Sequence, residues 1–549
     1  MLKIFIAFLF CATAGKVIAQ SGIDTVAVSH WAGLFDLQFT SAEKDSMIDG
    51  LKDNAATYVK MHHADLSNGQ VYPFKFNPVL PGFVVGTVQR EIHWDIPASV
   101  SLPANKNDLA FYSLLQLASL VKNRKISSLE LTRFFLSRLR KWGDTLHCVI
   151  SLTESLALSQ AAQADEEIRK GIYRGPLHGI PYGLKDLFAV KGTLTTWGAA
   201  PFRDQRVDED AFVYQQLRKA GAVLCAKLSL GALAMDDQWF GGLTRNPWNL
   251  ETGSSGSSAG STAATVAGLL PFAIGTETWG SIVAPSHTCG ATGLRPTFGS
   301  VSRTGAMVLS WSLDKIGPIC RSAEDAAIVF YYVKGKDGQD EGAVDRPFNY
   351  TGKVNWSALR IAYAKNYFEK LAATDPEWQV IEAFRKLGAN PLPVDFPDST
   401  IYPIPIMNPI IGAECAAAFD AFTRSDQDDL LNGQRKGDWP NQFRTGRFIP
   451  AVEYINANRH RYTLMIAMNA FMKSYDVLLL PSFSGNQLAI TNLTGQPVVC
   501  IPVGFTKEGM PTSMTLLGNL FDEATILAVA KAYQDATGFS KMHPAMFSK

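Results

Sequence analysis

The segment T-G-S-S-G-S-S-A-G-S-T, residues 252–262, decides how the chain is interpreted. Its glycine and serine content is typical of a flexible linker between domains. However, the apolar sequence A-A-T-V-A-G-L-L-P-F-A-I-G (263–275) follows it directly, and the two together are typical of one continuous core. Dense glycine and serine inside a core let the backbone approach other groups closely and bring hydroxyl groups together. We therefore interpret residues 252–262 as part of a functional site.

Two further patterns point to the same kind of site. The apolar run ends in G-T-E-T-W-G-S-I (275–282), where a serine follows a polar turn whose backbone N–H groups are free to stabilise an anion. The sequence P-L-H-G-I-P-Y-G-L-K-D-L (176–187) embeds Lys185 among apolar residues. Such a lysine is usually a surface residue whose stem covers apolar surface. If it is buried, its pKa falls and it can act as a base.

Together these patterns resemble the amidase signature family, and the resemblance covers about residues 108–537. The matching motifs, in the family's order, are G-P-L-H-G-I-P-Y-G-L-K-D-L (175–187), N-P-W-N-L (246–250), G-L-R-P-T-F-G-S-V-S-R-T-G (293–305), S-L-D-K-I-G-P (312–318), N-L-T-G-Q-P-V-V-C-I-P-V-G-F (492–505) and L-L-G-N-L-F-D-E-A-T-I-L (516–527). The resemblance implies an α/β fold, an α/β/α sandwich in which helices cover both faces of a large mixed β-sheet. It also implies a serine amidohydrolase that acts on a small-molecule or peptide amide, without cofactor or metal.

The family's Ser–cis-Ser–Lys triad maps onto three positions of this chain. The resemblance implies that Ser281 is the nucleophile, that Ser257, preceded by a cis peptide bond, is the bridging serine, and that Lys185 is the base. It also implies an oxyanion hole built from the backbone N–H groups of Thr278, Trp279, Gly280 and Ser281. Neutral Lys185 can take the proton of Ser257 while Ser257 takes that of Ser281, which makes an alcohol reactive toward an amide.

Two positions depart from the family's pattern. Trp279 stands where glycine is frequent, so its side chain either contacts the substrate, for example an aromatic acyl group, or faces the core. Val283 stands where arginine is frequent, which puts in doubt any substrate that needs a carboxylate partner there. We also expect Asp186 to be structural, because adjacent residues of a strand point to opposite faces.

The chain divides into three regions by pattern. Residues 1–19 (MLKIFIAFLFCATAGKVIA) resemble a signal peptide, with a positive start, an apolar run too short to span a bilayer, and small residues before Gln20. Residues 20–107 are predicted to be an N-terminal extension that wraps around the following domain, with a helix at Ser41–Val59 and a turn and strand at 79–88. Residues 108–540 are predicted to be one amidase domain, because helical stripes and short apolar strands alternate there. Its expected strands are 222–226, 359–364 and 477–481, and its expected helices cover 114–121, 129–139, 325–333 and 523–536.

Composition limits the location and the partners. The 549 residues carry 51 basic and 50 acidic side chains, and this balance gives no field to attract nucleic acid. We expect an exported protein, periplasmic or extracellular, with no membrane span after signal removal. The six cysteines beyond the signal peptide are widely spaced and are predicted to be buried free thiols. The sequence leaves the oligomeric state open, a homodimer included.

Three alternatives remain. G-S-S-A-G (256–260) also matches a nucleophile elbow, which would make Ser258 the nucleophile of an α/β-hydrolase-type esterase with His460 or His543 as the base. Within the family, the chain resembles the glutaminase (A) subunit of a tRNA-dependent amidotransferase, a cytosolic machine that an export signal contradicts. An exported binding protein with an inactive amidase fold is the third, and the presence of all three triad residues argues against it.

Overall fold

The computed structural model describes residues 22–63, 66–84, 86–398 and 404–549. Contacts within the chain divide it into two units, Met1–Ser67 and Asn68–Lys549. The first unit contains helices α1 (Thr25–Leu34) and α2 (Ser41–His62), which pack against each other. Thr40 and Glu43 form a capping box that starts α2 at the predicted residue. The signal-peptide prediction for residues 1–19 lies outside the described residues.

Residues 68–107 belong to the second unit, so the division falls at 67/68 rather than at the expected 107/108. Asn68 bonds to the backbone of Val308, and Trp94 packs its ring against Tyr350. The strand predicted within 79–88 is wrong for the described residues, which form a turn and an extended surface segment. The side chains of Val84 and Val88 are exposed, and side chains such as Asn349, rather than a neighbouring strand, bind the backbone that follows.

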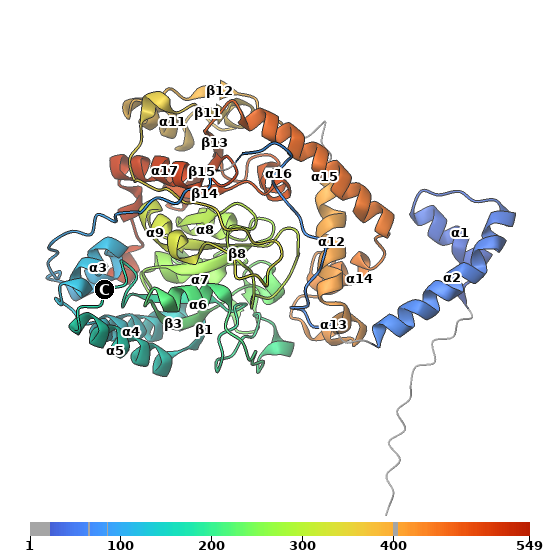
Figure 1. The fold of residues 1–549 in the computed structure, drawn as a ribbon, viewed down its shortest axis with the longest axis horizontal. Coiled ribbons are helices and arrows are strands. Elements are labelled where there is room, and N and C mark those ends of the chain that lie inside the picture. The colour runs from blue at the N-terminus through green and yellow to red at the C-terminus, as the bar shows by residue number, and fades with distance from the viewer. Residues whose placement is uncertain (1–21, 64–65, 85, 399–403) are drawn as a thin grey trace, which may run out of the picture. The chain divides into compact units, whose positions relative to one another are not determined.

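The described residues of the second unit form an 11-stranded mixed sheet (Figure 1). Its strands, in spatial order, are β1 (Val149–Leu152), β3 (Val223–Leu228), β2 (Pro181–Lys185), β8 (Ala273–Glu277), β10 (Lys315–Cys320), β9 (Thr292–Arg295), β14 (Val498–Phe505), β15 (Pro511–Gly518), β13 (Val477–Pro481), β11 (Ile361–Ala364) and β12 (Leu392–Val394). Strand β2 is parallel to β3 and β8, and β11 is parallel to β12 and β13, whereas the other pairs are antiparallel. Two small hairpins lie apart from this sheet, β4 (Gln238–Trp239) with β5 (Gly242–Leu243) and β6 (Arg245–Asn246) with β7 (Asn249–Gly253).

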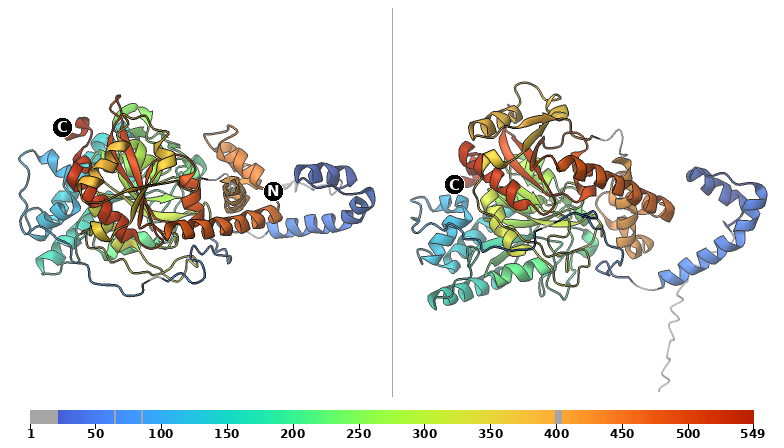
Figure 2. Two further views of the ribbon diagram at one scale, coloured as in Figure 1. Left: turned by 90° about the horizontal axis from the view of Figure 1, so that it is seen from above. Right: turned by 45° about the horizontal axis from the view of Figure 1, so that its top comes forward.

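Helices surround this sheet (Figure 2). They are α3 (Leu114–Lys122), α4 (Ser128–Leu146), α5 (Glu154–Arg169), α6 (Phe212–Lys219), α7 (Ala259–Val266), α8 (Val283–Cys289), α9 (Ala323–Val333), α10 (Lys365–Phe368), α11 (Glu377–Lys386), α12 (Met407–Ala418), α13 (Asp420–Arg424), α14 (Trp439–Gly446), α15 (Ala451–Met472), α16 (Gln487–Thr494) and α17 (Glu523–Thr537). All four helices that the sequence predicts in this unit are present.

Alternating strand residues show that both faces of the sheet are covered. In β13, Val477 and Leu479 belong to the core that includes α9 and α17, whereas Leu478 and Leu480 belong to the core that includes α15 and α16. Since successive strand residues point to opposite faces, the two cores lie on opposite sides of one sheet. The predicted α/β/α architecture is therefore confirmed.

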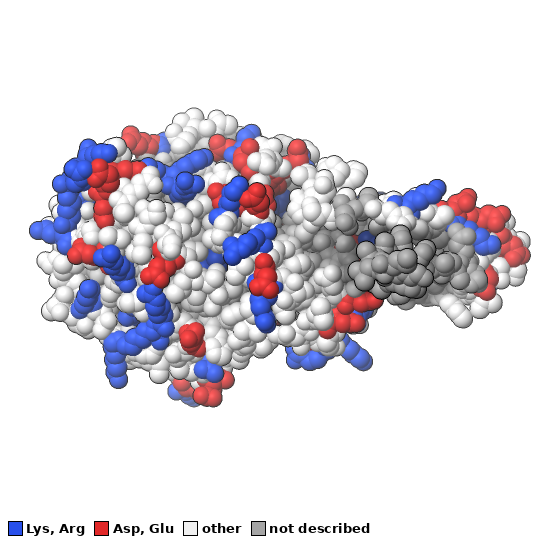
Figure 3. Space-filling model, turned by 90° about the horizontal axis from the view of Figure 1, so that it is seen from below, with Lys and Arg blue, Asp and Glu red and all other residues white. Residues whose placement is uncertain are grey.

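The remaining general features concern thiols, charge and membranes. The six cysteines of the described residues are all buried and unpaired, which confirms that prediction: Cys148, Cys225, Cys289, Cys320, Cys415 and Cys500. Basic and acidic side chains are interspersed on the face drawn in Figure 3, in keeping with the balanced composition. Within the described residues, no helix combines the length with the apolar content that a membrane span requires.

Candidate active site

Lys185 lies at the end of β2, beside the parallel strand β8. Its side chain is fully buried, and its Nζ lies 2.8 Å from Oγ of Ser257 and 2.9 Å from Oγ1 of Thr276. Burial lowers the pKa of Lys185 to about 7, although Asp314 and Glu277 act in the opposite direction. A lysine with this pKa is neutral in a large fraction of molecules near pH 7. It can therefore accept a proton, and of the two alternatives that the sequence left open, the structure shows the buried lysine rather than the surface one.

Asp186 is directed away from this site, as expected for the next residue of a strand. Its carboxylate pairs with Lys227 and accepts hydrogen bonds from the N–H and hydroxyl groups of Thr196. All three side chains are buried. Because Asp186 forms an ion pair with Lys227 rather than with Lys185, it does not hold Lys185 in the protonated state.

Ser257 and Ser258 lie in the turn between β7 and α7. The peptide bond Gly256–Ser257 is cis, as the resemblance implies, and the Ser257 side chain is buried against Lys185. The Ser258 hydroxyl also accepts a hydrogen bond from Lys185 Nζ, at 3.1 Å. Unlike that of Ser257, it is in addition bonded to the backbone of β8, because it donates to the carbonyl oxygen of Thr276 and accepts from its N–H. It is also fully buried. Ser258 therefore fastens the turn to β8 and has the environment of a structural residue, not of an exposed nucleophile.

The strand before this turn also differs from that of a nucleophile elbow. Strand β7 is partly exposed and pairs only within a small hairpin, so it is not a buried strand of the central sheet. The histidines that could serve as its base do not support an elbow either. His543 stacks on Phe111 with ring centroids 3.6 Å apart, and His460 lies on α15. His287, which follows Ser281 closely, has its Nδ1 2.7 Å from Oγ of Ser513, and burial lowers its pKa to about 4.

Ser281 lies in the turn between β8 and α8, next to Ser258. The Ser258 N–H donates to the Ser281 carbonyl oxygen at 3.1 Å, which joins the two serine-containing turns. Ser281, Thr278 and Trp279 line a cavity of about 760 Å³. Gly280 has a φ of +98°, a conformation that favours glycine. Lys185 and Ser257 are thus in direct contact, and Ser281, which lines the cavity, is joined to the same turn through Ser258.

The two departures from the family pattern have distinct outcomes. The Trp279 side chain is 43% exposed and borders the cavity, so the alternative that it faces the core is wrong. Val283 is fully buried among apolar residues on the opposite side of the turn. The position that is often arginine in the family therefore contributes core packing here.

Glu277 is a residue of the candidate site that the sequence analysis missed. Its Oε2 accepts hydrogen bonds from the N–H groups of Ile282 and Val283, directly after Ser281. Its Oε1 accepts from Arg295 and Asn492 at 2.7 and 2.9 Å. Burial raises its pKa, but Arg295 and Lys315 outweigh burial and lower the pKa to about 2. The sequence signal that could have identified Glu277 is an acidic residue at the end of an apolar run, four positions before Ser281.

Asp314 is a second acidic residue that the sequence analysis did not identify. Its carboxylate accepts a hydrogen bond of 2.6 Å from the hydroxyl of Thr278 and two more from the N–H groups of Leu309 and Ser310. It is half-buried, and its desolvation raises its pKa. Together Glu277 and Asp314 hold the two ends of the turn that carries the expected oxyanion-hole N–H groups of Thr278, Trp279 and Gly280.

Comparison with known proteins agrees with this geometry. The family described as Amidase matches residues 130–527. The A subunit of the glutamyl-tRNA(Gln) amidotransferase of Coxiella burnetii (strain Dugway 5J108-111) is 32% identical over 79% of this chain and 99% of its own length. Its counterpart in Methylococcus capsulatus is 33% identical over 79% of this chain and 98% of its own length. The peptide amidase of Stenotrophomonas maltophilia superimposes with a TM-score of 0.70 and 27% identity, over 79% of this chain and 98% of that one. The chain therefore belongs to the amidase family and is an enzyme that hydrolyses amide C–N bonds.

Proposed function

We propose that the protein is a serine amidohydrolase that cleaves the C–N bond of a carboxamide through an acyl-enzyme on Ser281. The observation that carries the proposal is the contact between Lys185 and Ser257, a buried amine with a pKa of about 7 placed 2.8 Å from a hydroxyl beside the Ser281 turn. A serine hydroxyl needs a base before it attacks an amide, and this arrangement supplies one.

In the proposed reaction the hydroxyl groups of Ser281 and Ser257 relay a proton to Lys185. Neutral Lys185 takes the proton of Ser257, Ser257 takes that of Ser281, and Ser281 Oγ bonds to the carbonyl carbon. The carbonyl oxygen becomes an oxyanion that the N–H groups of the turn stabilise, each worth about 3–4 kcal/mol. The C–N bond then breaks, and the relayed proton goes to the leaving nitrogen, which departs as ammonia or an amine. Water repeats the sequence on the acyl-enzyme and releases a carboxylic acid.

Site substitutions and covalent labelling test the proposal together. Ser281→Ala should remove nearly all amide hydrolysis and all labelling by a serine-directed fluorophosphonate. Ser257→Ala and Lys185→Ala should each lose several orders of magnitude, and the double variant little more, because the residues act as one relay. Cys415→Ser, a buried position on α12, serves as a control of similar size. Labelling that persists in Ser281→Ala but disappears in Ser258→Ala would contradict the proposal.

The second candidate function is that of the amidotransferase relatives, the glutaminase (A) subunit of a tRNA-dependent amidotransferase. It is favoured by the 32% identity that extends over 99% of the Coxiella burnetii protein's length. We prefer a hydrolase that acts alone, because residues 1–19 resemble an export signal. Purified protein should hydrolyse simple carboxamides without any partner. Activity toward glutamine alone, and only in the presence of partner proteins, would favour the second candidate.

We further propose that the protein is exported and that cleavage leaves Gln20 as the first residue. The support is the positive start, the apolar run and the small residues before Gln20. N-terminal sequencing of protein recovered from the periplasm or the medium tests this directly. An uncleaved chain confined to the cytosol would contradict it.

A further inference from the structure

A second cavity, of about 190 Å³, adjoins the one that contains Ser281. The two cavities share Ala234, Thr278 and Leu309 in their linings, so they meet at the turn before the nucleophile. Thr276 lines the second cavity, and its Oγ1 lies 2.9 Å from Nζ of Lys185. The second cavity therefore begins beside the base of the proposed relay.

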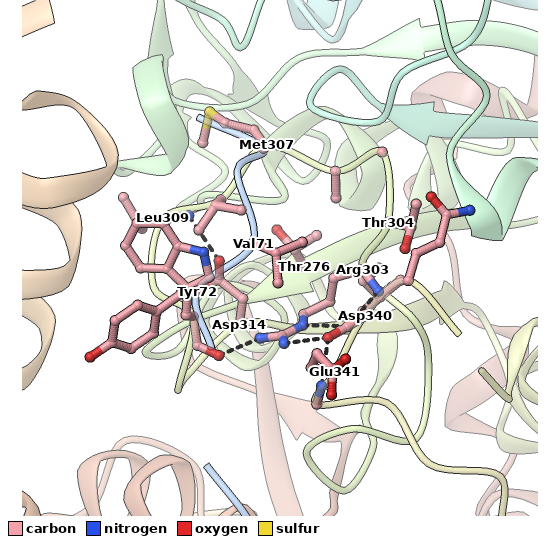
Figure 4. Close-up of a pocket in the computed structure, with 18 of the residues that line it drawn as sticks. Val71, Tyr72, Thr276, Arg303, Thr304, Met307, Leu309, Asp314, Asp340 and Glu341 are labelled. Atoms are coloured by element: carbon pink, nitrogen blue, oxygen red, sulfur yellow. Dashed lines mark hydrogen bonds and ion pairs between the residues drawn. The ribbon is translucent and has the colours of Figure 1, made fainter. Parts of the chain in front are cut away.

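One wall of this cavity comes from residues 69–75, a segment that precedes the family match at 130–527. Asn68 anchors the segment, because its side chain accepts from the N–H of Val308 at 2.8 Å and donates to its carbonyl at 2.9 Å. The ring of Tyr72 packs on Trp311 with centroids 5.6 Å apart. Figure 4 shows Val71 beside Thr276 and Leu309, at the centre of the lining residues.

Most of the surface that this cavity offers is apolar, although charged side chains also line it. Several of these have partners within the protein: Lys75 pairs with Glu341, and Lys315 donates to the carbonyl oxygen of Leu313. Arg303 forms an ion pair with Asp340, and the carboxylate of Asp314 receives three hydrogen bonds. Much of the apolar surface is contributed by Val71, Tyr72, Leu187, Met307, Leu309 and Trp311. An apolar cavity of about 150 Å³ is large enough for benzene. A cavity of about 190 Å³ thus has room for one six-membered ring, but not for a fused pair.

We propose that residues 69–75 close a binding site for a single aryl group, or an apolar group of that size, on the acyl part of the amide substrate. The proposal rests on the proposed function, and it assigns substrate selection to a segment outside the family's own sequence. Val71 and Tyr72 contribute the part of the wall that this segment supplies.

Substitutions at Val71 test the site by selectivity. In the wild-type enzyme, kcat/KM for 3-phenylpropionamide should exceed that for propionamide. Val71→Trp fills the cavity and should lower this ratio by about tenfold or more. Val71→Ala enlarges it and should raise kcat/KM for 3-(2-naphthyl)propionamide relative to the phenyl compound. Val88→Trp is the matched control, since Val88 is 71% exposed in the same extension and does not line the cavity, and it should leave both ratios unchanged.

Binding separates this proposal from the catalytic one. Calorimetry should detect binding of 3-phenylpropionamide to the Ser281→Ala variant. Adding Val71→Trp to this variant should weaken the binding about tenfold or more. Hydrolysis that survives Ser281→Ala would overturn the proposed nucleophile and leave the binding result standing. Equal losses for phenyl and unsubstituted substrates in Val71→Trp, or unchanged binding, would overturn the aryl site while the mechanism remained.

Discussion

Asp186 and Lys227 form an ion pair of 2.7 Å between two fully buried side chains, next in sequence to Lys185, the proposed base. Lys185 and Asp186 are neighbours in sequence, yet β2 directs one toward the serines and the other toward β3. A carboxylate beside Lys185 would favour its charged form and remove the base. The pair therefore separates the charge of Asp186 from the amine that must be neutral.

Asp186→Ala should destabilise the protein by about 3–5 kcal/mol, because it leaves the buried charge of Lys227 without a partner. Denaturant unfolding measures this loss. The double variant Asp186→Ala/Lys227→Met should recover part of the stability, since no buried charge is left unpaired. A double variant less stable than Asp186→Ala alone would show that the pair itself is not the cause.

Activity should rise with pH through about 7 and then level off. The pKa of Lys185 is lowered to about 7, so the amine is protonated and inactive below that pH and neutral above it. The pH profile of kcat/KM checks this. Lys185→Arg should be inactive across the whole range, because a guanidinium stays protonated. A Lys185→Arg enzyme with a near-normal rate would exclude the proton relay, even if Ser281 is the nucleophile.

Glu277→Gln should lower kcat by about 10–100-fold with little change in KM, because Glu277 fixes the turn that carries Ser281 without contacting substrate. Steady-state kinetics separates the two constants. Glu277→Asp, which keeps the charge on a shorter side chain, should lose less than Glu277→Gln. A rise in KM alone would contradict a positioning role.

Glu277 should also make stability depend on acid pH. Its folded pKa of about 2 lies below its ordinary value of 4.5, so its contribution is present above pH 4.5 and is lost as the pH falls toward 2. The free energy of unfolding, measured from pH 5 to pH 2, should fall more steeply in the wild type than in Glu277→Gln. Parallel curves would show that the carboxylate is not the responsible group.

Trp279→Ala should raise KM for aryl amides more than it lowers kcat. The side chain is exposed to the cavity, while the backbone N–H groups of the turn do not depend on it. Michaelis constants for the phenyl and unsubstituted amides measure the effect. Trp279→Phe, which keeps an aromatic surface, should fall between the alanine variant and the wild type. A fall in kcat with KM unchanged would place the role of Trp279 in the turn rather than in substrate contact.

Local signals determined much of the fold. Strand β13 has the bounds that the sequence predicts, and α9 and α17 differ from prediction by one or two residues. Helix caps, apolar periodicity and turn residues act within a few positions, so they can be read directly along the chain. The segment 79–88, whose described residues form no strand, shows the limit of such reading. A valine-rich run forms a strand only where another strand is available to pair with it.

By itself, the sequence determined the α/β class, the serine-rich turn and, through the family resemblance, the positions of Lys185, Ser257 and Ser281. Only the tertiary structure decided which groups surround them. Glu277 meets Asn492, 215 residues along the chain, and residues 69–75 reach the cavity beside Lys185. These contacts depend on the order of strands in the sheet, which places β2 beside β8. Burial of Lys185, and with it the lowered pKa, follows from that packing and not from its neighbours in sequence.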